Sequence, residues 1–217
     1  MTTVATGNVS PRFLARKLHS LTGVLPIGAF LLEHFWTNSY AMYGADAFNH
    51  AVEAIHSMPY LVFIEIGAIG LPILYHSLYG IVITLQGRPN SLQYKYARNW
   101  MYFLQRVTGV ILLLYIALHV YEQRIESALT GQAVTFDYVA HELSEPGMFA
   151  FYLLGVLSAV FHFANGLWAF LIGWGVTTTE RAMRRSAYVC GAIGVAMAAF
   201  GINALLAFFG KAFVVHF

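Results

Sequence analysis

The 217-residue sequence contains a single cysteine, Cys190, and very little charge. One thiol excludes an internal disulfide, an iron–sulfur cluster held by several cysteines and a C-x-x-C-H haem attachment within this chain. Lys, Arg, Asp and Glu together make up only 10% of the residues, against roughly 25% in soluble domains. Any metal or haem that the chain binds must therefore be held without a cluster of thiolates.

Signatures of soluble enzymes are also missing. No phosphate loop, dinucleotide fingerprint or serine-nucleophile elbow occurs in a strand–helix context, because the sequence has no convincing strand pattern. The first residues, MTTVATGNVSPRFLARK, lack the apolar stretch and the small-residue cleavage site of a secretory signal. We expect a cytoplasmic tail there and no nucleic acid partner.

Apolar residues, by contrast, are abundant: 59% of the residues are hydrophobic, 16% are aromatic and the mean hydropathy is +0.63. Five apolar segments reach the ~20 residues that are needed to cross a ~30 Å hydrocarbon core. They cover residues 18–36, 60–85, 100–122, 148–174 and 187–210. The sequence therefore predicts an all-α membrane protein, a single integral membrane domain over residues 1–217 with five transmembrane helices. Asp46 is expected to cap a short surface helix in the first connection.

Lys and Arg residues are distributed unevenly over the predicted connections. Ten of the twelve lie on one side of the predicted bundle: Arg12, Arg16, Lys17, Arg88, Lys95, Arg98, Arg106, Arg181, Arg184 and Arg185. The other side has Arg124 and Lys211. Because the cytoplasmic loops of membrane proteins carry the excess of Lys and Arg, we expect a cytoplasmic N-terminus and an outer C-terminus. The predicted location is the bacterial cytoplasmic membrane, which the chain crosses several times.

Four of the predicted spans carry one histidine each: His34, His76, His119 and His162. An ionisable side chain inside the bilayer needs a partner or a function. At ~1.5 Å per residue, His34 and His119 lie roughly 25 Å from the cytoplasmic edge, and His76 and His162 roughly 15 Å from it. The four histidines therefore form two layers of two, about 10 Å apart along the bundle.

Two imidazoles at the same depth on different helices are what a bis-histidine haem b requires. Full axial ligation leaves no open position for oxygen, so such a haem transfers electrons, and two stacked haems would carry them across the membrane. Small residues on the histidine-bearing faces, such as Gly23, Gly80, Gly155 and Thr108, leave room for a flat macrocycle. Small residues also let membrane helices pack closely, which is an equally good explanation of each one taken alone.

Three other interpretations compete with haem ligation. Any one intramembrane histidine can serve a hydrogen bond between helices. A zinc site would need its ligands around one point, which two layers about 10 Å apart do not offer. A haem-free proton-coupled transporter that uses the histidines as a relay remains an alternative from another functional class.

A resemblance to a known family rests on four segments: KLHSLTGVLPIGAFLLEHFWTNS, LPILYHSLYGI, QRVTGVILLLYIALHVY and VFHFANGLWAFLIGWGVTTTERA. Together they resemble the five-helix, dihaem cytochrome b anchor of succinate:quinone oxidoreductase, from Arg16 to Arg185, with the fifth helix less distinctive. The resemblance implies helices I to IV around two haems b, with helix V packed outside. It also implies that His76 and His162 ligate the inner haem, and that His34 and His119 ligate the outer one.

The same resemblance implies partners and a reaction. In this family a flavoprotein and an iron–sulfur subunit bind on the cytoplasmic side, where succinate is oxidised to fumarate, and electrons then reach a membrane quinone, often menaquinone. The chain would thus serve the tricarboxylic acid cycle within the lipid bilayer, and the dicarboxylate chemistry would belong to its partners. The anchor of a quinol:fumarate reductase is the nearest alternative, followed by the dihaem anchors of hydrogenase and formate dehydrogenase.

Several further residues are candidates for a role beside the haems. Candidate partners of the inner haem's propionates, or of the docked iron–sulfur subunit, are Arg16, His19, Ser20 and Arg106. Four other histidines are expected to be solvated: His50, His56, His141 and His216.

Glu65 is the candidate for proton or quinone chemistry. It precedes His76 by 11 residues, so it lies nearly on the same helix face and ~16 Å closer to the outside. A carboxylate at that depth is costly unless it faces a polar cavity. We therefore predict that Glu65 carries protons for quinone chemistry near the outer haem or contacts a propionate. An acid that water reaches just inside the outer interface is the alternative.

Overall fold

The computed structural model describes residues 10–88 and 90–212, and every regular element in these ranges is helical. The elements are α1 (Pro11–Val24), α2 (Pro26–Ser39), η1 (Tyr40–Tyr43), α3 (Ala45–His56), α4 (Leu61–Phe63), η2 (Ile64–Gly70), α5 (Leu71–Gln86), α6 (Ala97–Val120), η3 (Tyr121–Glu126), α7 (Ser127–Thr130), α8 (Phe136–Ser144), α9 (Pro146–Gly173) and α10 (Glu180–Ala207). Among them, η1 is a 3₁₀-helix, and η2 and η3 are π-helical. His216 lies outside the described residues, as do the first nine residues of the predicted tail.

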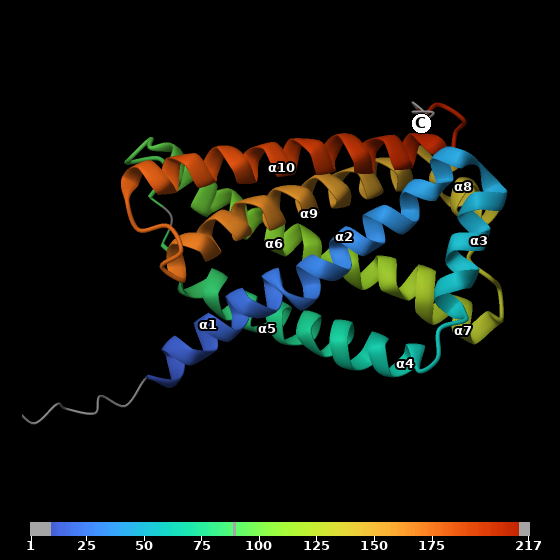
Figure 1. Ribbon diagram of the computed structural model, residues 1–217, viewed down its shortest axis with the longest axis horizontal. Coiled ribbons are helices and arrows are strands. Elements are labelled where there is room, and N and C mark those ends of the chain that lie inside the picture. Colours follow the sequence, from blue (N-terminus) through green and yellow to red (C-terminus); the bar gives the residue numbers. More distant parts are fainter. Residues whose placement is uncertain (1–9, 89, 213–217) are drawn as a thin grey trace, which may run out of the picture.

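Four continuous helices in the described ranges are long and apolar enough to cross a membrane. They are Leu61–Gln86, Ala97–Thr130, Pro146–Gly173 and Glu180–Ala207. The first joins α4, η2 and α5, and the second joins α6, η3 and α7. All four lie lengthwise along the bundle (Figure 1) and confirm four of the five predicted spans. The second, Ala97–Thr130, is longer than predicted, because Glu122, Arg124 and Glu126 continue a helix that the charge pattern ended at residue 122.

The first predicted span, residues 18–36, is not one continuous helix of membrane length. α1 and α2 have 14 residues each and meet at Leu25. Pro26 has no N–H, so one backbone hydrogen bond is missing at this point. The neighbouring bonds persist, with Leu25 N–H donating to the Leu21 oxygen at 2.9 Å and Ala29 N–H donating to the Leu25 oxygen at 3.0 Å. The two halves therefore follow one another obliquely across the bundle (Figure 1).

Helix α9 lies at the centre of the packing. It contacts α6, α10, α1 and α8, while α1 also packs on α5. α10 lies on the outside of the bundle, against α9 and α2. At one end, aromatic side chains of the short helices and of the chain after α10 form a cluster in which the Phe48 and Phe208 ring centroids are 5.3 Å apart, and those of Phe136 and Phe208 are 4.9 Å apart.

The expected surface helix in the first connection is present as α3, but the prediction for its cap is wrong. Gly44, with φ of 99°, is the residue that precedes the helix. This φ lies in a region that glycine enters without a steric penalty. Asp46 lies in the first turn and makes no side-chain capping bond. A carboxylate there still interacts favourably with the helix dipole.

The charged residues separate along the bundle. One end, which we call the basic end, comprises the start of α1, the connection from Gly87 to Tyr96, the first ten residues of α6 and the start of α10. It includes ten of the twelve Lys and Arg residues, with Glu180 as its acid. The opposite, acidic end comprises α3, α8 and the residues around η2 and η3 (Figure 1). Together with Glu33 of α2, this end carries the other nine acidic residues, and the basic residues on this side are Arg124 and Lys211.

Candidate functional site

Two histidines meet between α5 and α9, and we call them the inner pair. The ring centroids of His76 and His162 are 6.2 Å apart, and the ring planes make an angle of 78°. The Nδ1 atom of His76 lies 2.9 Å from the backbone oxygen of His19. The Nδ1 atom of His162 lies 3.2 Å from the hydroxyl of Thr108. In both rings the Nδ1 atom is thus occupied by an oxygen partner.

The other two histidines meet between α2 and α6 and form the outer pair. The ring centroids of His34 and His119 are 5.7 Å apart, with ring planes at 82°. The Nδ1 atom of His119 lies 3.4 Å from the hydroxyl of Tyr152, and its ring stacks on Tyr115 at 5.5 Å and 13°. The Nε2 atom of His34 lies 3.4 Å from the side-chain nitrogen of Asn38. The sequence analysis predicted both pairs from the depth of each histidine along its helix: His34 with His119, and His76 with His162.

The spacing within each pair fits two imidazoles on opposite faces of one metal. A metal–imidazole bond is about 2.0–2.1 Å long, so two rings with the metal between them have centroids roughly 6 Å apart. Within residues 10–88 and 90–212, no group of three or more His, Cys, Asp or Glu side chains is placed to hold a metal ion. In this part of the chain, two imidazoles face each other at each level, and the four ligands of a structural zinc site are not brought together.

Glycines allow the rings of the inner pair to approach their neighbours. A Cβ atom on Gly23 would lie 2.5 Å from Cε1 of His76, and one on Gly109 would lie 3.1 Å from Cε1 of His162. At about 100° per residue, the sequence places Gly23 on the face of His34, whereas in the structure it contacts His76 of the inner pair. By the same count Thr108 lies on the face of His119, and in the structure its hydroxyl also lies 3.2 Å from Nδ1 of His162 on α9.

Two of the candidate propionate partners carry buried polar atoms without a partner among the described residues. These atoms are Nδ1 of His19 and both Nε and Nη1 of Arg106. The His19 ring stacks on His76 at 3.9 Å and 15°. The Arg106 guanidinium lies 3.5 Å from the centroid of the Tyr102 ring. A buried guanidinium with two nitrogens that have no hydrogen-bond partner is costly, so both residues fit a site that receives an acceptor or an anion.

The other two candidates already have partners within the chain. Arg16 is exposed and its Nη2 atom lies 3.4 Å from the side-chain oxygen of Gln86. The Ser20 hydroxyl donates to the Lys17 backbone oxygen at 3.0 Å and accepts from the indole N–H of Trp174 at 3.0 Å. The structure thus brings His19 to the inner pair, whereas Ser20 faces Trp174.

Glu65 forms an ion pair that the sequence analysis did not anticipate. Arg124 donates from Nε and Nη2 to the two carboxylate oxygens of Glu65, at 2.9 and 2.7 Å. The side-chain exposure is 43% for Arg124 and 28% for Glu65. Both residues lie in π-helical turns, Glu65 in η2 and Arg124 in η3. Such turns are rare and occur frequently at functional sites.

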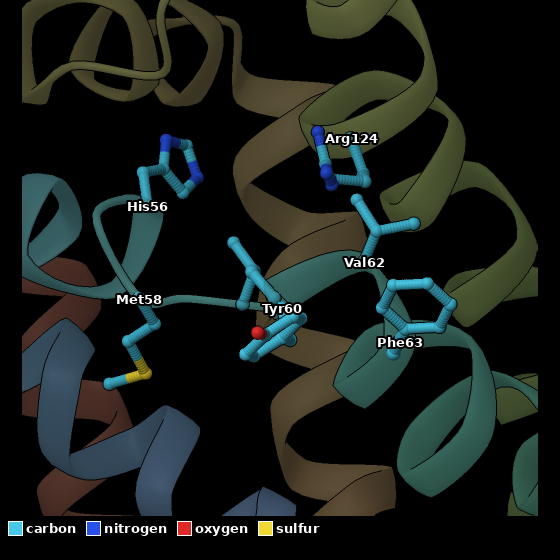
Figure 2. Close-up of a pocket in the computed structure, with 7 residues that line it drawn as sticks. His56, Met58, Tyr60, Val62, Phe63 and Arg124 are labelled. Atoms are coloured by element: carbon cyan, nitrogen blue, oxygen red, sulfur yellow. The ribbon is translucent and has the colours of Figure 1, made fainter.

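An open pocket of about 590 Å³ lies beside this ion pair. Its lining includes His56 and Tyr60, which precede the helix Leu61–Gln86, and Arg124 (Figure 2). Tyr60 has the left-handed backbone conformation, with φ of 62°. The pocket therefore presents an apolar wall with one cation at its edge. As expected for solvated residues, His50, His56 and His141 are exposed.

The outer pair is connected to the acidic end through Tyr152, whose side chain is only 5% exposed. Its hydroxyl accepts from the Gln123 amide at 3.0 Å and lies 3.5 Å from a carboxylate oxygen of Glu122. The same Gln123 amide donates to Glu142 at 2.5 Å.

A second tyrosine, Tyr138 of α8, lies near the same carboxylate. Burial raises the pKa of Tyr138 to about 12, and the hydrogen bond to Glu142 adds to this rise.

Facing imidazole pairs at two levels of an apolar helix bundle are the features that a membrane-embedded cytochrome b requires. Residues 84–201 match the family of succinate dehydrogenase/fumarate reductase transmembrane subunits. Over 196 residues, 90% of the chain, the sequence is 47% identical to the succinate dehydrogenase cytochrome b558 subunit of Bacillus subtilis (strain 168), of which it covers 96%. The chain belongs to this family and is a multi-pass membrane subunit of a complex of this class, which confirms the resemblance drawn from the four histidine-bearing segments.

Proposed function

We propose that this chain is the dihaem electron-transfer anchor of a succinate dehydrogenase. The inner pair, His76 and His162, would ligate one haem b, and the outer pair, His34 and His119, a second. The observation that carries this proposal is the spacing of the two pairs, 6.2 and 5.7 Å between ring centroids. The relative's name, a cytochrome b558 subunit of succinate dehydrogenase, supports it. When bound, a haem with two axial imidazoles supplies one-electron transfer without an open iron position.

The unsatisfied atoms near the inner pair support a haem there in particular. Haem b carries two propionate groups, which need cationic or hydrogen-bonding partners. Arg106 would provide Nε and Nη1, and His19 would provide Nδ1, the buried polar atoms of these side chains that have no partner. Neither a transporter relay nor a simple hydrogen bond between helices accounts for a buried guanidinium with two nitrogens that have no hydrogen-bond partner among the described residues.

The basic end is the proposed docking surface for the flavoprotein and iron–sulfur subunits. Ten Lys and Arg residues against one acid give this end the charge expected of the cytoplasmic side. The acidic end would then face outward. On this arrangement electrons enter nearest the inner pair and leave nearest the outer pair, and the relative's name favours the direction of succinate oxidation.

The proposed quinone site lies near the outer pair, beside Glu65 and Arg124. Reducing a quinone to a quinol consumes two electrons and two protons, so a protonatable group beside the site has a role, and Glu65 is the proposed carrier. Arg124 follows His119 by five residues on the same continuous helix, which is about 7 Å along its axis. The pocket of about 590 Å³ next to Arg124 would admit the quinone to this site from the edge of the bilayer. Menaquinone is the quinone we expect.

A haem determination on the purified complex tests the proposal. We expect two b-type haems per chain, from haem extraction and a reduced-minus-oxidised absorption spectrum. Replacing His162 with Leu should remove the inner haem alone, and replacing His119 with Leu the outer one. The exposed His141 provides a matched control, since His141→Leu should retain both haems. A colourless wild-type complex would refute haem ligation and leave the transporter alternative.

A further inference from the structure

Helices α6 and α9 each supply a hydroxyl group to the other's histidine. Thr108 of α6 lies 3.2 Å from Nδ1 of His162 on α9. Conversely, Tyr152 of α9 lies 3.4 Å from Nδ1 of His119 on α6. One of these contacts belongs to the inner pair and the other to the outer pair. The second ring of the inner pair, His76, has its closest Nδ1 partner in the His19 backbone oxygen at 2.9 Å, with the Thr22 hydroxyl further away at 3.5 Å.

The direction of the contact at Thr108 follows from its other partners. The Thr108 hydroxyl has one proton and lies 2.8 Å from the backbone oxygen of Leu104 and 3.2 Å from that of Gln105. These oxygens accept only, so the hydroxyl proton points to the helix backbone. The oxygen lone pairs then face His162. His162 must accordingly carry its proton on Nδ1, which leaves Nε2 unprotonated.

The same reasoning applies to Tyr152. Its hydroxyl lies 3.5 Å from a carboxylate oxygen of Glu122 and accepts from the Gln123 amide at 3.0 Å. The phenol has one proton, which it donates to the Glu122 carboxylate oxygen, so an oxygen lone pair is left for His119. The ring of Tyr152 is almost fully buried, which keeps the hydroxyl in place.

We propose that Thr108 and Tyr152 are positioning residues for the two haems, each holding the Nδ1 proton of one ligand so that Nε2 is presented to iron. The proposal rests on the haem ligation described above. A hydrogen bond from the second ring nitrogen fixes the orientation of a ligating histidine and raises its basicity. A more basic ligand favours the ferric state, so removal of the hydroxyl should raise the midpoint potential of the haem concerned.

The two hydroxyls act on different haems, which makes the proposal testable on the intact complex. Thr108→Val should shift the midpoint potential and the low-spin electron paramagnetic resonance signal of the inner haem alone, and Thr108→Ser should restore both. Tyr152→Phe should shift those of the outer haem alone. Tyr121→Phe is the matched control, because Tyr121 lies near His119 in sequence but is 50% exposed.

Each outcome separates this proposal from the ligation itself. Two haems with unchanged potentials and signals in Thr108→Val and Tyr152→Phe overturn the positioning role and leave ligation intact. Equal shifts of both haems in either variant also overturn it, since they indicate a general loosening of the bundle. Should Thr108→Val fail to assemble, Thr108→Ala carries the same expectation. A wild-type complex without haem would overturn the proposed function instead.

Discussion

Gly23 provides the sharpest test of how closely helix α1 approaches the inner pair. A Cβ atom at this position would lie 2.5 Å from Cε1 of His76, about 1 Å closer than an optimal carbon–carbon contact. In Gly23→Ala the imidazole must therefore tilt or move away. Its Nδ1 atom is held at 2.9 Å from the His19 backbone oxygen, and its ring is stacked on His19 at 3.9 Å. The movement would disturb both contacts.

The expected cost follows from this crowding. Overpacking by one methyl group costs about 1–3 kcal/mol, which lowers the affinity for the inner haem by roughly 5- to 150-fold at about 1.4 kcal/mol per factor of ten. We expect Gly23→Ala to lose part of the inner haem and to retain the outer one, as measured by haem extraction and the reduced-minus-oxidised spectrum of the purified complex.

A matched control comes from a glycine without neighbours. A Cβ atom on Gly191 of α10 would meet nothing within 4 Å, so Gly191→Ala should retain both haems. A Gly23→Ala complex with two haems and an unchanged inner-haem spectrum would refute the argument that α1 and His76 are in tight contact.

Three further predictions concern single polar contacts. Arg106→Leu should lower the midpoint potential of the inner haem, because a cation beside the propionates stabilises the more negatively charged reduced state. An unchanged potential in a redox titration would rule out a propionate contact. Glu65→Gln breaks the bidentate ion pair with Arg124. It should reduce quinone turnover at least tenfold while the haem spectra stay unchanged. Full turnover would exclude a role of Glu65 in proton delivery. Gln105→Leu removes the hydrogen bonds to the His162 backbone oxygen at 3.0 Å and from Asn165 at 2.7 Å. With about 0.6–1.7 kcal/mol for each such bond between membrane helices, the thermal unfolding midpoint should fall by a few degrees, and no change would show that the two contacts contribute nothing.

The two histidine pairs were accessible from the sequence because depth in a membrane helix depends on residue number alone. A constant rise of ~1.5 Å per residue and alternating helix directions are enough to predict that His34 meets His119 and His76 meets His162. The charge separation between the two ends follows from the same count. Their role as haem ligands stays a prediction that the spacing supports.

Contacts that depend on helix rotation and crossing angle could not be derived in this way. The pairing of Glu65 with Arg124 requires two π-helical turns to face each other, and a run of apolar residues contains no signal for a π turn. The proximity of Gly23 to His76 depends on how α1 crosses α5. The sequence did contain one signal that the span prediction left unused, since Pro26 marks the point where the first helix divides.

The division at Pro26 means that one stretch of chain serves both levels of the bundle with separate orientations. The segment before Leu25 supplies the groups that touch His76, and the segment after it supplies His34. In a single straight helix, a rotation of α1 about its axis would rotate α2 by the same angle. Because the helix is divided between them, the surroundings of the inner pair and of the outer pair can change by substitution independently of each other.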